Sequence, residues 1–117
     1  MFYGCTSLTT APELPATTLA QSCYNGMFYS CTSLTTAPEL PATTLTEFCY
    51  YHMFQYCQNL NHIKCLATDK SATYCTNDWV SGVATTNGTF IKHPNMTSWA
   101  IGAHGIPSGW VVENYTE

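Results

Sequence analysis

The residues best suited to chemistry in this sequence are its seven cysteines, which can bind soft metal ions or form disulfides. Six of them recur at a spacing of 26 residues, in two groups: Cys5, Cys31 and Cys57, and Cys23, Cys49 and Cys75. Residues repeated in phase with a stacked structure lie along its axis, where cysteine behaves as a small buried hydrophobe. The repetition therefore favours a structural role for these thiols and leaves Cys65 outside both groups.

Two arrangements of the same thiols could still carry chemistry. A disulfide between Cys65 and Cys75 would fix the start of the C-terminal segment, and it stands as the alternative to free thiols. Cys57, His62, Cys65 and Cys75 also spell C-x4-H-x2-C-x9-C, a set of four zinc-ligand types. Two of these four already have a structural explanation, and the spacing matches no zinc finger or knuckle. The sequence therefore predicts no metal site and no cofactor.

Two carboxylates occupy one repeated position. Glu13 and Glu39 lie 26 residues apart, so we expect them close together on an exposed face. Such a pair could bind a cation, serve acid–base catalysis, or be two solvated side chains. Acid–base catalysis needs carboxyl groups with different pKa values, which one repeated environment does not supply. Since there is also no Gly-x-Ser-x-Gly elbow and no glycine-rich phosphate loop, the sequence predicts no catalytic residue and no enzyme.

The tyrosines are better candidates for recognition, because exposed rings suit sugars and protein hot spots. Tyr3 and Tyr29 recur at the repeat spacing. Tyr24 and Tyr50 recur as well, and helical phasing places this pair near the buried stripe, so a core role is equally open for it. The predicted binding residues lie on the exposed face of the repeats: Thr10, Glu13, Tyr29, Thr36 and Glu39.

All these side chains are positioned by a 26-residue unit that the chain repeats almost verbatim. The first copy spans residues 1–26, the second 27–52, and an eroded third copy 53–78. Six of the 26 positions differ between the first two copies: Gly4/Ser30, Ala20/Thr46, Gln21/Glu47, Ser22/Phe48, Asn25/Tyr51 and Gly26/His52. A period of this length predicts stacked supersecondary units rather than one globular core.

Each copy is expected to contain a short strand and a short helix. The T-x-x-E pattern of residues 44–47 is a capping box and predicts a helix start, and an apolar stripe follows it at i, i+4 and i+8: Leu45, Cys49 and Met53. Residues 33–41 are rich in threonine and bounded by proline, which predicts a brief strand. Its inward side chains would be Leu34, Ala37 and Leu40.

Residues 79–117 differ in character from the repeats. They contain all three tryptophans, and Asn87-Gly88 predicts a hairpin between residues 80–85 and 89–92. A stacked array closes its apolar end with an atypical unit, so this segment is predicted to be a β-rich cap. Because Met1 lies at the same repeat position as Met27, we expect the chain to be the C-terminal part of a longer array, with self-association through its uncapped N-terminal face.

The phrase MFYxCTSLTTAPELPATTL at a period of 26 resembles the BspA-like leucine-rich repeats of Bacteroides-type bacterial surface proteins, over residues 1 to about 66. The resemblance implies an α/β fold: a leucine-rich-repeat solenoid of about three coils, each with a short strand and a short helix, over residues 1–78. The β-rich capping segment would follow at 79–117. One departure is the Pro-Glu insertion between the inward-facing residues, where the family has a continuous strand.

The composition limits the classes of partner that the chain is expected to bind. With three basic and seven acidic residues, a net charge of −4 and no basic stripe, the chain is not expected to bind nucleic acid. No apolar stretch approaches the roughly 18 residues of a membrane helix, so no membrane insertion is expected. The resemblance implies a non-enzymatic, secreted or cell-surface module for recognition and adhesion that binds a host protein or glycan. The alternative is a structural spacer, or a phage-tail-like display element, with no ligand of its own.

Overall fold

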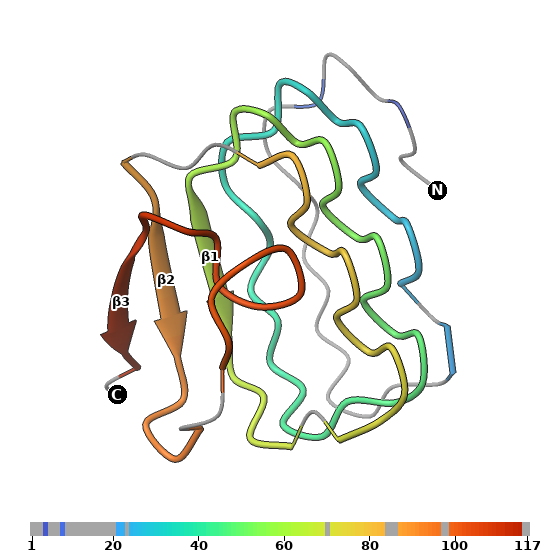
Figure 1. Ribbon diagram of the computed structural model, residues 1–117, viewed down its shortest axis with the longest axis vertical. Helices are drawn as coiled ribbons and strands as arrows, with labels where there is room; N and C mark the ends of the chain where they lie inside the picture. Colours follow the sequence, from blue (N-terminus) through green and yellow to red (C-terminus); the bar gives the residue numbers. More distant parts are fainter. Residues whose placement is uncertain are drawn as a thin grey trace.

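The part of the chain that the computed structural model describes consists of strands and turns. It comprises Gly4, Leu8 and residues 21–22, 24–69, 71–83, 87–96 and 99–115, and no helix occurs among these residues. Three short strands are present: β1 (His62–Cys65), β2 (Thr89–Lys92) and β3 (Val111–Asn114). They form one parallel sheet in the order β1-β2-β3 at one side of the molecule (Figure 1).

The sheet joins successive layers of the chain. His62 of β1 pairs with Thr89 of β2, and Thr89 pairs with Val111 of β3. The second copy continues this pairing through isolated bridges rather than a strand, since Thr36 bridges His62 and Leu40 bridges Cys65. A proline cannot donate to a ladder, and Pro38 lies between the two bridging residues of the second copy. Its position explains why pairing there is interrupted, as the sequence predicts.

Opposite the sheet, the layers are made of three turn segments, which we define as residues 21–22 with 24–30, residues 47–56 and residues 73–82. Their N–H groups alternate between two partners. Tyr51 donates to the carbonyl of Phe48 at 3.3 Å, which closes a turn, whereas the next residue, His52, donates to the carbonyl of Asn77 in the following layer at 3.2 Å. The pattern repeats along the described residues of the first two segments, so their backbone N–H groups are satisfied without a helix. Figure 1 shows these segments running side by side.

A left-handed backbone conformation recurs at every fourth residue of the turn segments. Nine residues there have φ between 53° and 80°: Ser22, Gly26, Ser30, Phe48, His52, Tyr56, Tyr74, Asp78 and Gly82. A right-handed helix cannot contain such residues, because each one reverses the local handedness of the chain. Because left-handed residues recur at every fourth position, each segment is a ribbon of turns.

The predicted α/β leucine-rich-repeat solenoid of strand-plus-helix coils is therefore wrong. The stripe that indicated a helix, Leu45, Cys49 and Met53, is buried, but its spacing of four residues follows the period of the turns. On an α-helix a spacing of four drifts by about 40° at each step, whereas a four-residue ribbon of turns keeps such residues on one side. The architecture observed instead is one open parallel sheet backed by stacked turns.

The predicted hairpin at Asn87-Gly88 is also wrong. Residues 89–92 form β2, which pairs in parallel with β1 and β3 and not with the preceding segment. Gly88 is buried, and a Cβ atom built on it would lie 2.1 Å from the indole of Trp110, so glycine is needed there to admit this ring. Within the predicted capping segment 79–117, β2 thus pairs directly with β1 of the third copy, and β3 pairs with β2.

The core fills the space between the sheet and the turn segments. Leu34, Ala37 and Leu40 are buried, as the sequence predicts. Along the stacking direction run two buried columns of rings: Phe28 stacks on Phe54 at 5.8 Å, and Tyr50 stacks between Tyr24 and Trp79 at 6.2 and 5.8 Å. Of the two roles left open for Tyr24 and Tyr50, the structure shows the core role.

A loop between residues 101 and 109 covers the third turn segment (Figure 1). The carbonyl of Ala103 accepts from the N–H of Val80 at 3.2 Å, and the carbonyl of Gly105 accepts from the indole N–H of Trp79 at 2.8 Å. His104 accepts from the backbone N–H of Asp78 through its Nδ1 atom at 2.9 Å. These bonds replace the interlayer bonds that another turn segment would supply.

Candidate ligand-binding site

The largest group of partly exposed rings lies on the outer surface of the turn segments, which we call the turn face. Its members come from consecutive layers: Tyr29, Phe48, Tyr51, His52, Tyr56 and Tyr74. Tyr56 is 44% exposed and Tyr74 is 56% exposed. The rings meet edge to face or tilted, as for Phe48 with Tyr51 at 5.3 Å and 88°, and Tyr29 with Tyr56 at 5.5 Å and 75°. Such a surface offers several ring faces and edges to a ligand.

Four of these six residues have a left-handed backbone conformation. Phe48, His52, Tyr56 and Tyr74 have φ between 53° and 64°. Bulky residues rarely adopt this conformation, and each instance costs about 1–3 kcal/mol. For Phe48, His52 and Tyr56 the equivalent positions of the preceding layer carry smaller residues: Ser22, Gly26 and Ser30. The turn face therefore carries large rings where small residues would be less strained.

The difference between the first two copies explains how this surface arises. Three of the six differing positions replace Ser22, Asn25 and Gly26 by an aromatic or imidazole side chain one layer on: Phe48, Tyr51 and His52. Residues 31–45, which include the bridging residues of the sheet side, are identical in sequence to residues 5–19. Divergence is thus concentrated on the turn face, which is the signal that the sequence analysis missed.

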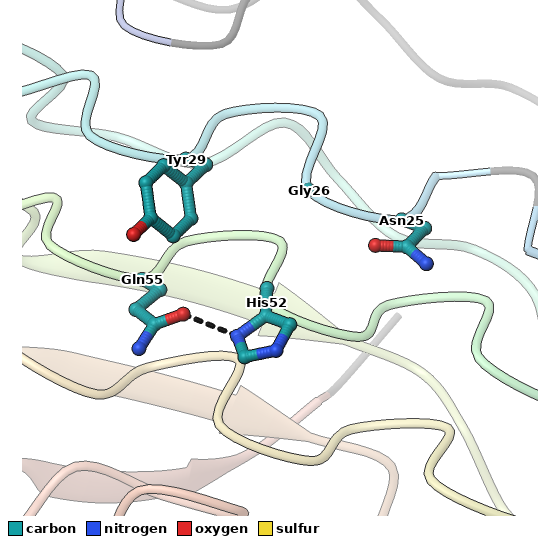
Figure 2. Close-up of a pocket in the computed structure, with 5 residues that line it drawn as sticks. All are labelled: Asn25, Gly26, Tyr29, His52 and Gln55. Carbon is teal, nitrogen blue, oxygen red and sulfur yellow. Dashed lines mark hydrogen bonds between the residues drawn. The ribbon is translucent and has the colours of Figure 1, made fainter.

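Within the turn face lies a hollow of about 360 Å³, lined by Asn25, Gly26, Tyr29, His52 and Gln55. Figure 2 shows that Asn25, Gly26 and Tyr29 come from one layer and His52 and Gln55 from the next. The rings of Tyr29 and His52 are 6.4 Å apart at an angle of 75°. The hollow is formed where glycine in one layer faces histidine in the next, because Gly26 contributes no side chain.

The residues predicted to bind from the sequence are not brought together. Tyr29 lines the hollow, whereas Thr36 and Glu39 are exposed on the sheet side, where Thr36 bridges His62 and the Glu39 carboxylate pairs with Lys64 at 3.2 Å. Thr10 and Glu13 lie outside the described residues, so the predicted pair of carboxylates is not described. The predicted N-terminal apolar face also falls there, except for Leu8, which packs against the core.

The described thiols belong to the core. The candidate bridge between Cys65 and Cys75 is not formed in this structure, where the described cysteines are buried thiols: Cys31, Cys49, Cys57, Cys65 and Cys75. Burial raises the pKa of the Cys57 thiol, and likewise that of Cys65, to about 12, which keeps both thiols protonated and unreactive.

The candidate zinc pattern does not form a site. On a strand, residues three apart point to opposite faces, and Cys65 is buried whereas His62 is partly exposed. Among the residues that the structure describes, no cluster of three histidine, cysteine or acidic side chains could hold a metal ion.

Comparison with known proteins identified no relative. A scan against protein-family models found no match, and searches of curated proteins and of solved structures also found none. Within the described part of the chain, no helix is long and apolar enough to cross a membrane.

Proposed function

We propose that this chain is a non-enzymatic recognition module that binds a protein or a glycan outside the cell, and that its binding surface is the turn face. The observation that carries the proposal is that three of the six differences between two near-identical copies introduce rings on the turn face, two of them, Phe48 and His52, at strained positions. Large rings in a left-handed conformation weaken the fold, so a binding role offers the reason for keeping them.

Stacked layers suit this role, because they present an extended surface with side chains at a fixed spacing. Partly exposed tyrosine rings supply large contact area and lose little conformational freedom on binding. The exposed carboxylate of Glu39 is engaged by Lys64 on the sheet side, and the side-chain exposures of this pair are 54% and 24%. Recognition is therefore assigned to the turn face rather than to the sheet side predicted from Thr36 and Glu39.

The alternative, a spacer with no ligand, is supported by the repetition itself, since near-verbatim copies are an economical way to extend a structure. A spacer needs no change of surface between layers, however, and does not account for Phe48, Tyr51 and His52 replacing small residues. The two functions thus predict different results when these three residues are replaced.

The first copy supplies the variant that separates them. In the triple variant Phe48→Ser, Tyr51→Asn, His52→Gly, each residue is replaced by the one that the preceding layer already accommodates. Binding of the purified chain to immobilised extracellular-matrix proteins and glycans would be measured by surface plasmon resonance, with the variant Thr36→Ala, Glu39→Gln as the control on the sheet side.

We expect a saturable partner that binds the original chain and the sheet-side control equally and the triple variant at least tenfold more weakly, about 1.4 kcal/mol. Thermal melting of both variants would establish that the fold is intact. A chain that binds no member of the panel, or whose partner is retained by the triple variant and lost by the control, would contradict the turn-face proposal.

A further inference from the structure

The hollow between Asn25, Gly26, Tyr29, His52 and Gln55 has a chemistry that identifies a class of ligand. None of these five side chains carries a formal charge when the imidazole is neutral. Lysine and arginine are the side chains that bind phosphate, sulfate and carboxylate ligands most strongly, and neither type lines the hollow. A cationic ligand would require a carboxylate or a closed aromatic cage, and the lining contains neither.

The walls of the hollow are two rings at a steep angle. The Tyr29 and His52 rings are inclined by 75°, with centroids 6.4 Å apart. The His52 ring is itself held by Tyr51, whose centroid is 3.8 Å away. A Cβ atom built on Gly26 would meet nothing within 4 Å, so the space on this side of the hollow is open. A ligand with a flat apolar face could therefore lie against one of these rings.

The polar groups around the hollow include both donors and acceptors. The Oε1 atom of Gln55 accepts a hydrogen bond from Nδ1 of His52, and Nε2 is an acceptor when the ring is neutral (Figure 2). The same bond fixes the Gln55 amide, whose NH₂ group is a donor. Asn25 adds an exposed amide with both functions. Hydroxyl groups, which donate and accept at once, match this mixture.

We infer that the hollow binds one uncharged sugar residue of a glycan, with a C–H face of the pyranose ring against Tyr29 or His52 and its hydroxyls on the Gln55 and Asn25 amides. This inference rests on the proposed function and specifies its ligand. The volume of about 360 Å³ lies within the range of small-ligand pockets, roughly 300–1,000 Å³. Because the hollow is open at the surface, the remainder of the glycan would extend along the other rings of the turn face.

The chain offers a matched pair of amides for the test. Gln55 lines the hollow, whereas Gln58 is exposed three residues further on and does not line it. Lactose, N-acetyllactosamine, chitobiose, cellobiose and mannobiose would be titrated into labelled protein, with sialyllactose and a heparin disaccharide as charged probes. The signals followed by NMR would be the ring protons of His52 and the side-chain amide of Gln55.

We expect at least one uncharged disaccharide to shift the His52 and Gln55 signals saturably, with affinity in about the millimolar range for such a small probe. Gln55→Ala should weaken this binding roughly tenfold and Gln58→Ala should leave it unchanged, with both variants melting as the original chain does. Equal or stronger binding of the charged probes, or equal effects of the two glutamine variants, would overturn the inference.

The two proposals fail in different ways. If no uncharged disaccharide shifts these signals at about 10 mM, but a protein partner binds and is lost in the Phe48→Ser, Tyr51→Asn, His52→Gly variant, the sugar inference is overturned and recognition by the turn face stands. If neither a saccharide nor a protein binds, both proposals are overturned.

Discussion

One inner column of aromatic rings and the rings of the turn face are arranged differently in the part of the chain that the structure describes. The inner column of Tyr24, Tyr50, Trp79 and Trp99 stacks face to face, with angles of 8°, 15° and 2° between consecutive rings. The rings of the turn face meet at angles from 39° to 88°. Within the inner column Tyr24 and Tyr50 share one repeat position, whereas three outer rings, Phe48, Tyr51 and His52, occupy positions where the first two copies differ. The inner set therefore stabilises the stack, whereas the outer set is the one to which we assign the proposed recognition.

The largest loss of stability should come from removing a ring from the inner column. Trp79 is completely buried, stacks between Tyr50 and Trp99, and donates from its indole to the carbonyl of Gly105 at 2.8 Å. Trp79→Ala should lower the free energy of unfolding by about 3–5 kcal/mol, measured by urea denaturation. The outer Tyr74→Ala should cost less than about 1 kcal/mol, since its ring is 56% exposed. Similar losses for the two variants would remove the distinction between the sets.

A second prediction concerns the buried ring of Trp110, which rests on the backbone of Gly88. A methyl group there would lie 2.1 to 2.3 Å from the indole, so Gly88→Ala should destabilise the chain by about 1–3 kcal/mol. In a Trp110→Leu background, the smaller side chain should make the same substitution nearly neutral. Urea denaturation of the four chains gives the coupling, and an unchanged cost in that background would mean that the ring does not explain the glycine.

The buried thiols should also lower the free energy of unfolding at alkaline pH. Burial raises the pKa of the Cys57 thiol from 9.0 to about 12, and that of Cys65 similarly. Between these pH values the unfolded chain loses thiol protons that the folded chain keeps, so raising the pH favours unfolding. The free energy of unfolding should be unaffected by these thiols below pH 9 and should fall above it by up to about 1.4 kcal/mol per pH unit for each. Cys57→Ala should reduce the slope, whereas an unchanged slope would exclude this thiol as its source.

The sequence predicts the layers better than the elements that build them. The 26-residue period correctly places Cys31, Cys49, Cys57 and Cys75 in the buried core, because a residue repeated in phase lies at the same depth in each layer. The prediction of a helix is wrong, since apolar residues spaced four apart are compatible with both a helix and a ribbon of turns. The serine and glycine positions at every fourth residue of the first copy were the sequence feature that favoured turns.

The candidate site was harder to predict for a related reason. The features that the copies share predict binding by Thr36 and Glu39, which lie on the sheet side. Of the predicted binding residues that the structure describes, only Tyr29 lines the hollow. The hollow depends on Gly26 in one layer and His52 in the next, which is a difference between copies. In addition, the hydrogen bonds that bring the two layers into contact join residues 25 apart, and no local pattern indicates them.

The smallest predicted effect is a gain in stability, and it tests the rings of the turn face alone. His52→Gly should relieve about 1–2 kcal/mol of strain at φ 56°, against an entropic cost for glycine of about 0.5–1 kcal/mol. The free energy of unfolding should therefore rise by about 0.5 kcal/mol, measured as a higher midpoint in urea, while binding at the hollow is lost. Tyr51→Asn, whose residue does not have positive φ, should give no such gain. A variant that gains stability and loses its ligand would show that histidine is kept at this position for binding, whereas a loss of stability would assign the outer rings to the fold.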